Sequence, residues 1–439
     1  MHEPRHGTVQ LHLEARAPFL PVVTQFVESA ASLFGLARTE SLKLSLATEE
    51  IFLHLCGAVC AGEQLETACQ DGLYYTRVLF RFHAPQLNLK GLNIASDSAK
   101  DGQCDLDEMG LMIASRSVDR LHLTEEKGHR ICLAVTMEKV YPRFSEQLPR
   151  PAAPAGVSVE EPDRERVKRF ALLAGRFSPE RDRPPFFAYP GKVADMVAGG
   201  EYRCLTAISQ KREIVGGIIF SGRSERIVQF HGPYLFSEGE QIAAADALLT
   251  ALIASIARTK ALGLLSLAGL PKALEPQFEH LGSLPPSTAE GPGGGVSFFF
   301  RHLHEDPGAE VWVPADLTVW LTGEYDRLVL ARQIRTVQAM GETRLGASLF
   351  AAEIVRERAE ATLRPLWPGA DLAANVARHV RYLQADGLTT LLFEIDLGLP
   401  WHAELIPVLM ANGFTPALLL PFAGQADLVI FQHHDATES

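Results

Sequence analysis

The chain has 439 residues, of which 47% are hydrophobic and 21% are charged, and its formal net charge is −12. At roughly 100–200 residues per domain, this length predicts two to four globular domains. The net negative charge repels phosphate backbones and anionic lipid, and no cluster of Lys and Arg residues in the sequence offsets it. We therefore expect neither nucleic-acid nor membrane binding.

Targeting and metal-binding signals are missing from the sequence. Residues 1–18 mix His, Glu and Arg without an apolar core, so they predict no secretory signal. The longest apolar stretch, residues 242–257, is too short to span a bilayer and predicts a buried helix. The six cysteines form no Cys-x-x-Cys pair. Together these features predict a cytoplasmic protein with reduced cysteines and no metal site.

The first 145 residues predict a mixed α/β domain. Residues 8–13 alternate apolar and polar side chains, which is typical of a half-buried strand. Residues 19–36 and 39–59 repeat apolar side chains at helical spacing. Thr39 and Ser41 are both suitable N-cap residues for the second of these helices. The elements expected after them are a strand at 74–82, a helix at 108–118, and strands at 119–124 and 129–139.

The rest of the chain predicts a linker followed by an internal repeat. Proline and alanine dominate residues 148–156 and charged residues follow, so we expect a linker over 146–165. Each repeat begins with a loop that contains Pro, an aromatic residue and Gly. An apolar helix, a buried strand, the tripeptide Gly-Leu-Pro and a short helix leading to Gly then follow in that order. The copies run through 233–282 and 365–414, with Gly-Leu-Pro at 269–271 and 398–400 and the short helices at 278–282 and 408–414. We expect tandem domains over 166–302 and 303–439.

A candidate acid–base pair lies on the second expected helix. Glu50 and His54 are four residues apart and share a helical face, where a carboxylate can serve as a general base. Residues 42–54, 109–121 and 128–133 resemble the anti-sigma-factor serine-kinase type of histidine-kinase-like (GHKL) ATPases. The resemblance implies a GHKL α/β sandwich over residues 1–145.

The resemblance also implies a nucleotide site for ATP or ADP. Glu50 takes the position of the family's catalytic general base. Gly110 and Leu111 take the position of the family's Gly-Leu segment, which starts the helix whose N-terminus contacts the nucleotide phosphates. His54 stands where the family has an Asn that holds Mg²⁺, and imidazole is a poor Mg²⁺ ligand. Residues 83–86 lack the Asp that reads adenine. Asp107 and Glu108 each add charge repulsion of about 1 kcal/mol against a bound phosphate. These departures argue against Mg-ATP turnover.

The repeat resembles the acyl-CoA-dependent N-acetyltransferases (GNAT). The residues that carry this resemblance are Val-Gly-Gly-Ile-Ile-Phe at 215–220, the order of elements in 345–432, and Leu-Met-Ala-Asn-Gly-Phe at 409–414. It implies that backbone N–H groups of a Gly-containing loop at a helix N-terminus hold the acyl-CoA pyrophosphate. The residues at these positions are Gly239 in the first copy, and Arg364, Gly369 and Ala370 in the second.

The acyl-CoA loops also depart from the family pattern. Neither copy has the full spacing of glycines, and acidic residues lie in both loops. Glu238 and Glu240 flank Gly239 in the first copy. Asp371 follows Ala370 in the second copy, where it is equally well explained as a helix cap.

The predicted fold class is therefore α/β (α+β), with a GHKL-like sandwich followed by tandem GNAT-like domains. One interpretation is a regulatory protein, a homodimer whose degenerate ATP-binding module binds an anti-sigma or anti-anti-sigma-like partner. The alternative is an N-acyltransferase that uses acetyl-CoA or another acyl-CoA and is regulated by the N-terminal module. A third, a serine/threonine kinase, requires turnover despite His54. Whether the protein is an enzyme stays open.

Overall fold

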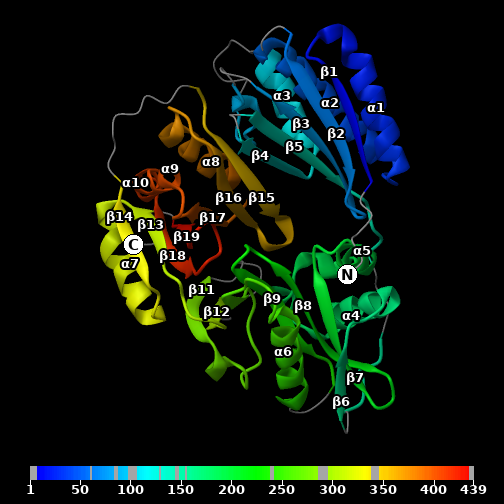
Figure 1. The fold of residues 1–439 in the computed structure, drawn as a ribbon, viewed down its shortest axis with the longest axis vertical. Coiled ribbons are helices and arrows are strands. Elements are labelled where there is room, and N and C mark those ends of the chain that lie inside the picture. Colours follow the sequence, from blue (N-terminus) through cyan, green and yellow to red (C-terminus); the bar gives the residue numbers. More distant parts are fainter. Residues whose placement is uncertain are drawn as a thin grey trace. The chain divides into compact units, whose positions relative to one another are not determined.

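The computed structural model describes residues 7–59, 62–83, 88–96, 106–127, 130–143, 148–153, 156–237, 242–284, 295–337 and 346–434. Figure 1 draws the elements in colours that follow the sequence. The chain divides into two compact units. Unit 1 comprises Met1–Val140 and Ala339–Phe393, and unit 2 comprises Tyr141–Gln338 and Glu394–Ser439. The residues expected to form the last domain, 303–439, are therefore divided between the two units.

Unit 1 begins with a five-stranded antiparallel sheet in the order β1-β2-β3-β5-β4. The expected order of strand, two helices, strands, helix and two strands is confirmed, although β2 was not identified from the sequence. The strands are β1 (Thr8–Glu14), β2 (Gln64–Asp71), β3 (Tyr75–Phe82), β4 (Arg120–Glu126) and β5 (Arg130–Glu138). The helices are α1 (Leu20–Leu33), α2 (Arg38–Ala58) and α3 (Leu106–Ser117), with short 3-10 turns η1 (Ala17–Phe19) and η2 (Lys90–Leu92).

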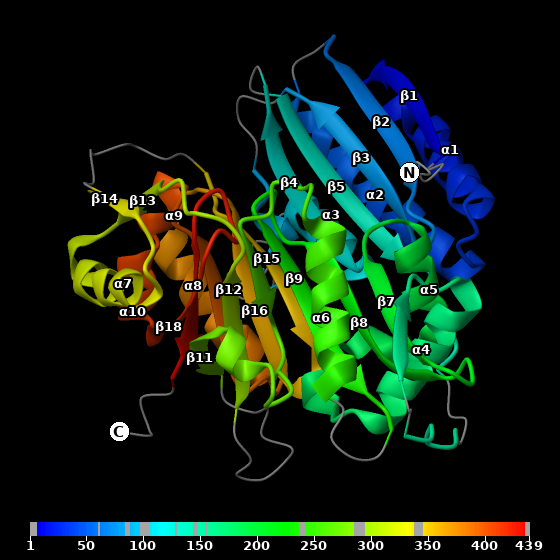
Figure 2. The ribbon, with the colours of Figure 1, turned by 60° about the horizontal axis from the view of Figure 1, so that its bottom comes forward.

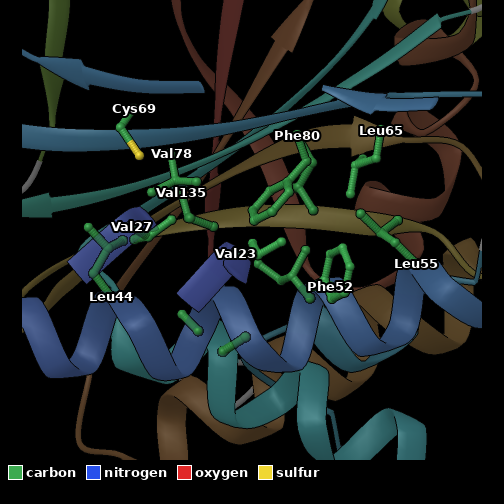
Figure 3. Close-up of a cluster of buried hydrophobic side chains, with 14 of the residues drawn as sticks. Val23, Val27, Leu44, Phe52, Leu55, Leu65, Cys69, Val78, Phe80 and Val135 are labelled. Atoms are coloured by element: carbon green, nitrogen blue, oxygen red, sulfur yellow. The ribbon is translucent and has the colours of Figure 1, made fainter. Parts of the chain in front are cut away.

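One face of this sheet packs against the helices (Figure 3). Alternate residues of a strand point to the same face, so Val78, Phe80 and Phe82 of β3 are all 0% exposed. Leu44 and Leu55 of α2 face them across the core and are also 0% exposed. Burying each such side chain stabilises the fold by about 1.5–3 kcal/mol. The apolar periodicity of the sequence thus accounts for this core.

The second part of unit 1 is a strand–strand–helix–strand segment. Strands β15 (Leu349–Val355) and β16 (Glu360–Trp367) pair antiparallel. Helix α8 (Leu372–Ala385) then crosses over to β17 (Thr390–Asp396), which pairs parallel with β16. Leu349 belongs to the same buried cluster as the N-terminal sheet and helices. The N-terminal module and this segment therefore share one hydrophobic core.

Unit 2 contains a seven-stranded sheet in the order β11-β12-β10-β9-β8-β7-β6 (Figure 2). Neighbouring strands are antiparallel except β9 and β10, which are parallel and joined by helix α6 (Ile242–Ile256). The strands are β6 (Val157–Glu160), β7 (Arg203–Ser209), β8 (Ile214–Gly222), β9 (Ile227–Leu235), β10 (Gly263–Ser266), β11 (Glu279–Leu284) and β12 (Val296–His302). Helix α6 packs on one buried cluster, and α4 (Arg164–Phe177) and α5 (Pro190–Ala198) pack on another.

Two expectations for this sheet need correction. Strand β6 and the start of α4 lie within the expected linker 146–165, because Val157–Glu160 pairs with β7 and Asp163 caps α4 by accepting from the Arg166 N–H at 2.9 Å. The short helix expected at 278–282 is instead strand β11, preceded by the turn η5 (Glu275–Gln277). Pairing with the phenylalanine-rich strand β12 outweighs the local helical pattern there.

The remainder of unit 2 contains a parallel strand pair and an antiparallel hairpin. Strands β13 (Ala309–Val313) and β14 (Arg332–Thr336) are parallel and joined by α7 (Ala315–Leu328). The hairpin, β18 (Phe414–Leu420) and β19 (Leu428–His433), follows two short helices, α9 (Pro400–Ala403) and α10 (Ile406–Ala411). Unit 2 also has the 3-10 turns η3 (Glu180–Asp182) and η4 (Pro185–Ala188), and unit 1 has η6 (Arg356–Arg358).

Three general features concern the part of the chain that the structure describes. None of its helices has the length and apolarity that crossing a bilayer requires. Within it, no three His, Cys, Asp or Glu side chains gather so as to hold a metal ion. Its free thiols are Cys56, Cys69, Cys132 and Cys204.

A buried ion cluster stabilises the position of β14 within unit 2. The Arg332 side chain is 0% exposed and donates to both carboxylate oxygens of Asp427, with Nε–Oδ2 at 2.6 Å and Nη2–Oδ1 at 3.0 Å. It also donates to Asp306, and its guanidinium lies 4.6 Å from the centroid of the Phe422 ring. Because the cluster excludes water, each carboxylate depends on this one cation.

We predict that Arg332→Met lowers the free energy of unfolding by about 3–5 kcal/mol, because it leaves two buried carboxylates without their cation. Arg335→Met is the matched control on the same strand, since Arg335 pairs with Glu310 at the surface, with side chains 49% and 47% exposed. Arg335→Met should lower the free energy of unfolding by less than about 1 kcal/mol. Equal losses in the two variants, measured by denaturant unfolding, would contradict the role of the cluster.

Candidate functional site

The structure brings together Glu50 of α2 and Gly110 of α3. A Cβ atom built on Gly110 would lie only 2.2 Å from Glu50 Oε2, so a side chain at position 110 would displace the carboxylate. Helix α3 begins at Leu106, two residues before the expected start at 108 and four residues before Gly110. The Gly110 N–H therefore lies beyond the four free donors of the helix start. The Leu111 side chain is 1% exposed and belongs to the core.

The charges around this pair differ from the sequence-based picture. Burial, and secondly the neighbouring Glu49 carboxylate, raise the pKa of Glu50 above its ordinary value. Lys90 pairs with both oxygens of Glu108, each at 3.1 Å, so this acid is neutralised where repulsion of a phosphate was expected. His54 lies one turn after Glu50 on α2. Nucleotide binding by these residues stays a prediction, and positions 84–87 and 128–129 lie outside the described residues.

In the second copy, the predicted acyl-CoA loop contacts its own chain. The Ala370 N–H donates to the Gly346 carbonyl oxygen at 3.0 Å. A Cβ built on Gly369 would lie 2.1 Å from the Ser348 backbone nitrogen, so only glycine allows this close approach. Arg364 lies on β16 and pairs with Glu353 at 2.9 Å. The structure thus joins Gly369 and Ala370 in one loop but directs Arg364 to a surface ion pair.

Asp371 lies at the amino end of α8, beside this loop. Its Oδ1 accepts from the Ser348 N–H at 2.6 Å and from the Ser348 hydroxyl at 2.8 Å, and its Oδ2 accepts from Arg378 at 2.9 Å. Burial alone would raise the pKa of Asp371. The hydrogen bonds from Ser348 and the pairing with Arg378 outweigh burial and hold that pKa below its usual range. A fixed carboxylate thus lies where a bound phosphate would need positive potential.

In the first copy, two parallel strands separate early. The β9–β10 ladder runs only from Ile227 and Gly263 to Phe230 and Ser266, whereas β9 continues to Leu235. Within the described part of the chain, no strand pairs with β9 on this side beyond Phe230. Predicted residue Gly239, in the loop between β9 and α6, lies outside the described residues.

Backbone geometry makes the end of β9 an open hydrogen-bonding edge. The Phe236 N–H donates to the Val215 carbonyl at 2.9 Å, on the β8 side. Successive N–H groups of a strand alternate between its two edges, so the Leu235 N–H points to the other side. This donor lies between the β9 end and the start of α6. Sequence reasoning missed this edge, although the short length of the β10 segment next to a longer β9 segment is a signal for it.

The comparisons with known proteins find no matching family model and no matching curated protein. Matches among solved structures include a GNAT acetyltransferase from Staphylococcus aureus Mu50, at 15% identity over 34% of this chain and 100% of that chain, with a TM-score of 0.26. Another is aminoglycoside 6'-acetyltransferase type Ii, at 15% identity over 34% of this chain and 99% of that chain, with a TM-score of 0.28. A third is an Escherichia coli GNAT family N-acetyltransferase in complex with CoA, at 20% identity over 36% of this chain and 86% of that chain, with a TM-score of 0.24. Likeness at this level carries no argument about activity.

A buried neutral histidine lies behind the second-copy loop. His379 of α8 is 0% exposed, its Nδ1–H donates to the Asn375 carbonyl at 2.9 Å, and its ring lies 5.3 Å from that of Phe350. Burial lowers the pKa of His379 to about 4. The folded chain therefore binds fewer protons than the unfolded chain between pH 6.5 and 4, and this site loses stability as the pH falls through that window.

We predict that His379→Leu removes about 3 kcal/mol of the stability loss between pH 6.5 and 4, a value obtained from the pKa difference. Denaturant unfolding at both pH values measures the effect. His304→Leu, at an exposed position, is the control and should leave the pH dependence unchanged. An unaltered pH dependence in His379→Leu would show that this histidine is not buried in its neutral form.

Proposed function

We propose that the chain is an acyl-CoA-dependent N-acyltransferase whose donor site lies in the first copy, between the end of β9 and the start of α6. The observation that carries this proposal is the early end of the parallel β9–β10 ladder at Phe230 and Ser266. An extended acyl donor can add to such an edge as a strand does, through main-chain hydrogen bonds. The Leu235 N–H is the donor that points there.

The adjoining helix supplies the second element of the proposed site. Helix α6 is long, and its positive amino end follows β9 after a short loop. Free N–H groups at such an end favour phosphate, which is the chemistry of the acyl-CoA pyrophosphate. Gly239 in this loop stays a predicted contact. The first copy thus offers an edge for the arm of the donor next to a helix end for its phosphates.

The reaction that suits this arrangement is aminolysis of a thioester. The amine nitrogen attacks the thioester carbonyl, a C–N bond forms, the C–S bond breaks, and the proton lost by the amine balances the one gained by the CoA thiolate. Negative charge develops on the carbonyl oxygen during attack. A fixed backbone N–H directed at that oxygen stabilises the transition state more than the ground state.

The second copy is a poorer donor site for physical reasons. At the amino end of α8, the Asp371 carboxylate accepts from Ser348, and the Ala370 N–H is bonded to Gly346. An incoming pyrophosphate would have to break these bonds and approach a carboxylate of the same charge. We therefore expect one acyl-CoA site per chain.

We predict that Leu235→Pro weakens acetyl-CoA binding about tenfold, because proline has no N–H to donate. Leu235→Ala keeps the donor and shortens the same side chain, so its affinity should stay within about threefold of the unaltered protein. Isothermal titration calorimetry measures both, with circular dichroism as a check of folding. Equal affinity in the two variants would contradict the open-edge site, and failure of any CoA thioester to bind would remove the proposed function.

A second candidate function is regulatory nucleotide binding by the N-terminal module, with a protein partner of the anti-sigma type. The observation that favours it is the contact of the Glu50 carboxylate with Gly110, which joins two residues of the predicted site. Burial raises the pKa of Glu50, the residue that the resemblance assigns as the general base. In this proposal, ATP or ADP binds beside α2 and α3 and modulates acyl transfer.

We predict that Gly110→Ala abolishes the rise in Tm that ATP or ADP produces, because the new methyl group displaces Glu50. Gly57→Ala is the matched control, since a Cβ built on this α2 glycine meets nothing within 4 Å. It should keep the full nucleotide-dependent shift, measured by differential scanning fluorimetry. An unaltered protein whose Tm does not respond to either nucleotide would rule out this candidate.

A further inference from the structure

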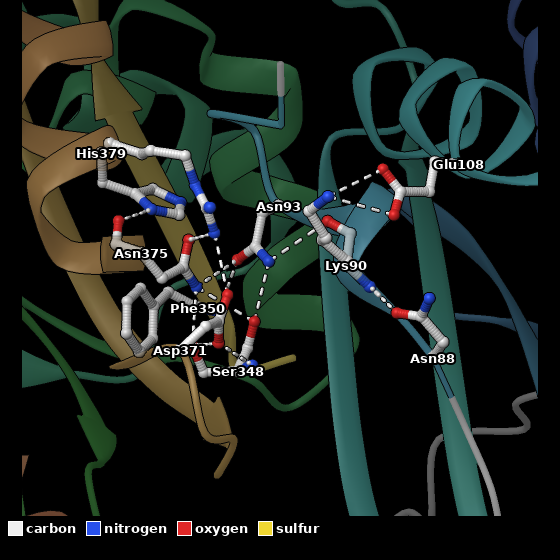
Figure 4. Close-up of polar contacts among 10 residues, drawn as sticks. Asn88, Lys90, Asn93, Glu108, Ser348, Phe350, Asp371, Asn375 and His379 are labelled. Carbon is white, nitrogen blue, oxygen red and sulfur yellow. Dashed lines mark hydrogen bonds and ion pairs between the residues drawn. The ribbon is translucent and has the colours of Figure 1, made fainter. Parts of the chain in front are cut away.

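A single side chain of the N-terminal module takes the place of a neighbouring strand at the start of β15. Asn93 Nδ2 donates to the Ser348 carbonyl oxygen at 2.8 Å, and Asn93 Oδ1 accepts from the Phe350 N–H at 3.1 Å (Figure 4). A carbonyl and an N–H two residues apart face the same edge of a strand, where the N–H and the C=O of one residue of a parallel partner strand would bond both. The Asn93 carboxamide supplies both of these bonds.

Helix α8 completes this contact from the other side. Asn375 Nδ2 donates to the Ser348 carbonyl at 3.0 Å and to its hydroxyl at 2.9 Å, and it lies 3.3 Å from Asn93 Oδ1. The exposed fractions of Asn93, Ser348 and Asn375 are 1%, 0% and 0%. In such a dry cluster, removal of one partner leaves the others unsatisfied, at about 1–3 kcal/mol for each group.

The segment that carries Asn93 also contacts α3. Lys90 pairs with Glu108, and a Cβ built on Gly91 would lie 2.4 Å from the Glu108 carbonyl oxygen. Further along, Arg116 of α3 donates to the Ile94 carbonyl at 3.2 Å. The same guanidinium lies 5.7 Å from the Tyr382 ring centroid of α8. Residues 88–96 therefore pack against α3, which carries Gly110, and against the second copy.

We propose that β15, β16 and α8 of the second copy form an internal docking domain that recognises the N-terminal module through residues 88–96. Their loop at the amino end of α8 is specialised for this contact rather than for acyl-CoA. A movement of α3 changes its contacts with residues 88–96 and, through Arg116, with Tyr382 of α8, so the second copy responds to the state of the N-terminal module. This inference does not depend on acyl-CoA binding by the first copy.

Hydrogen–deuterium exchange of the full-length protein tests the docking contact with two matched variants. Asn93→Ala removes the carboxamide from the cluster. Asn88→Ala, in the same segment, removes only a local hydrogen bond in which Asn88 Oδ1 accepts from the Lys90 N–H at 3.1 Å. We expect Asn93→Ala to speed exchange at least tenfold in peptides covering 346–355 and 372–380, and Asn88→Ala to leave these rates within twofold.

The control peptides lie in β8 and β9 of unit 2, which should exchange at unchanged rates in both variants. Unchanged exchange at 346–355 in Asn93→Ala, or equal effects of the two substitutions, would overturn the proposal. If Asn93→Ala does not fold, Asn93→Ser serves in its place, since it keeps a small polar side chain but cannot bond both backbone groups. An acetyl-CoA titration that finds two sites per chain would also overturn it, whereas the absence of binding would remove only the proposed acyl-transfer function.

Discussion

Parallel pairing of two consecutive strands is the constraint on which both C-terminal copies depend. A tight turn cannot join parallel strands, so the chain must cross over through a helix. In each copy the crossover helix starts next to the carboxyl end of the first strand, as α6 follows β9 and α8 follows β16. This connection places a helix N-terminus with free N–H groups beside a strand end. The candidate sites of both copies arise from it.

The two copies use this shared geometry differently. In both, the parallel ladder ends before the first strand does, at Phe230 of β9 and at Leu363 of β16. In the second, Asp371 and Ser348 occupy the helix end, and Asn93 from the N-terminal module completes the cluster. The proposed donor site thus belongs to the first copy, whereas polar side chains of the chain itself fill the helix end in the second. The difference comes from a few polar side chains and not from the topology.

The local elements were predictable from the sequence, but the contacts that decide function were not. Apolar periodicity correctly indicated the helix and the buried strand of each copy, because that pattern reports which face of an element is buried. It missed β2 and assigned β11 to a helix, since strand pairing depends on partners elsewhere in the chain. Gly110 was identified, yet its contact with Glu50 requires the packing of α3 on α2. Asn93 gave no local signal, because its bond to Ser348 joins residues 255 positions apart.

The most direct test of the account is a hydrogen–deuterium exchange map of the full-length protein with and without saturating acetyl-CoA. The account predicts slower exchange in peptides that cover 231–237 and the first turns of α6, and no change at 346–350 or 369–375. Protection at the amino end of α8 would contradict the assignment of donor binding to the first copy and of docking to the second. Unchanged exchange throughout the chain would contradict acyl-CoA binding itself.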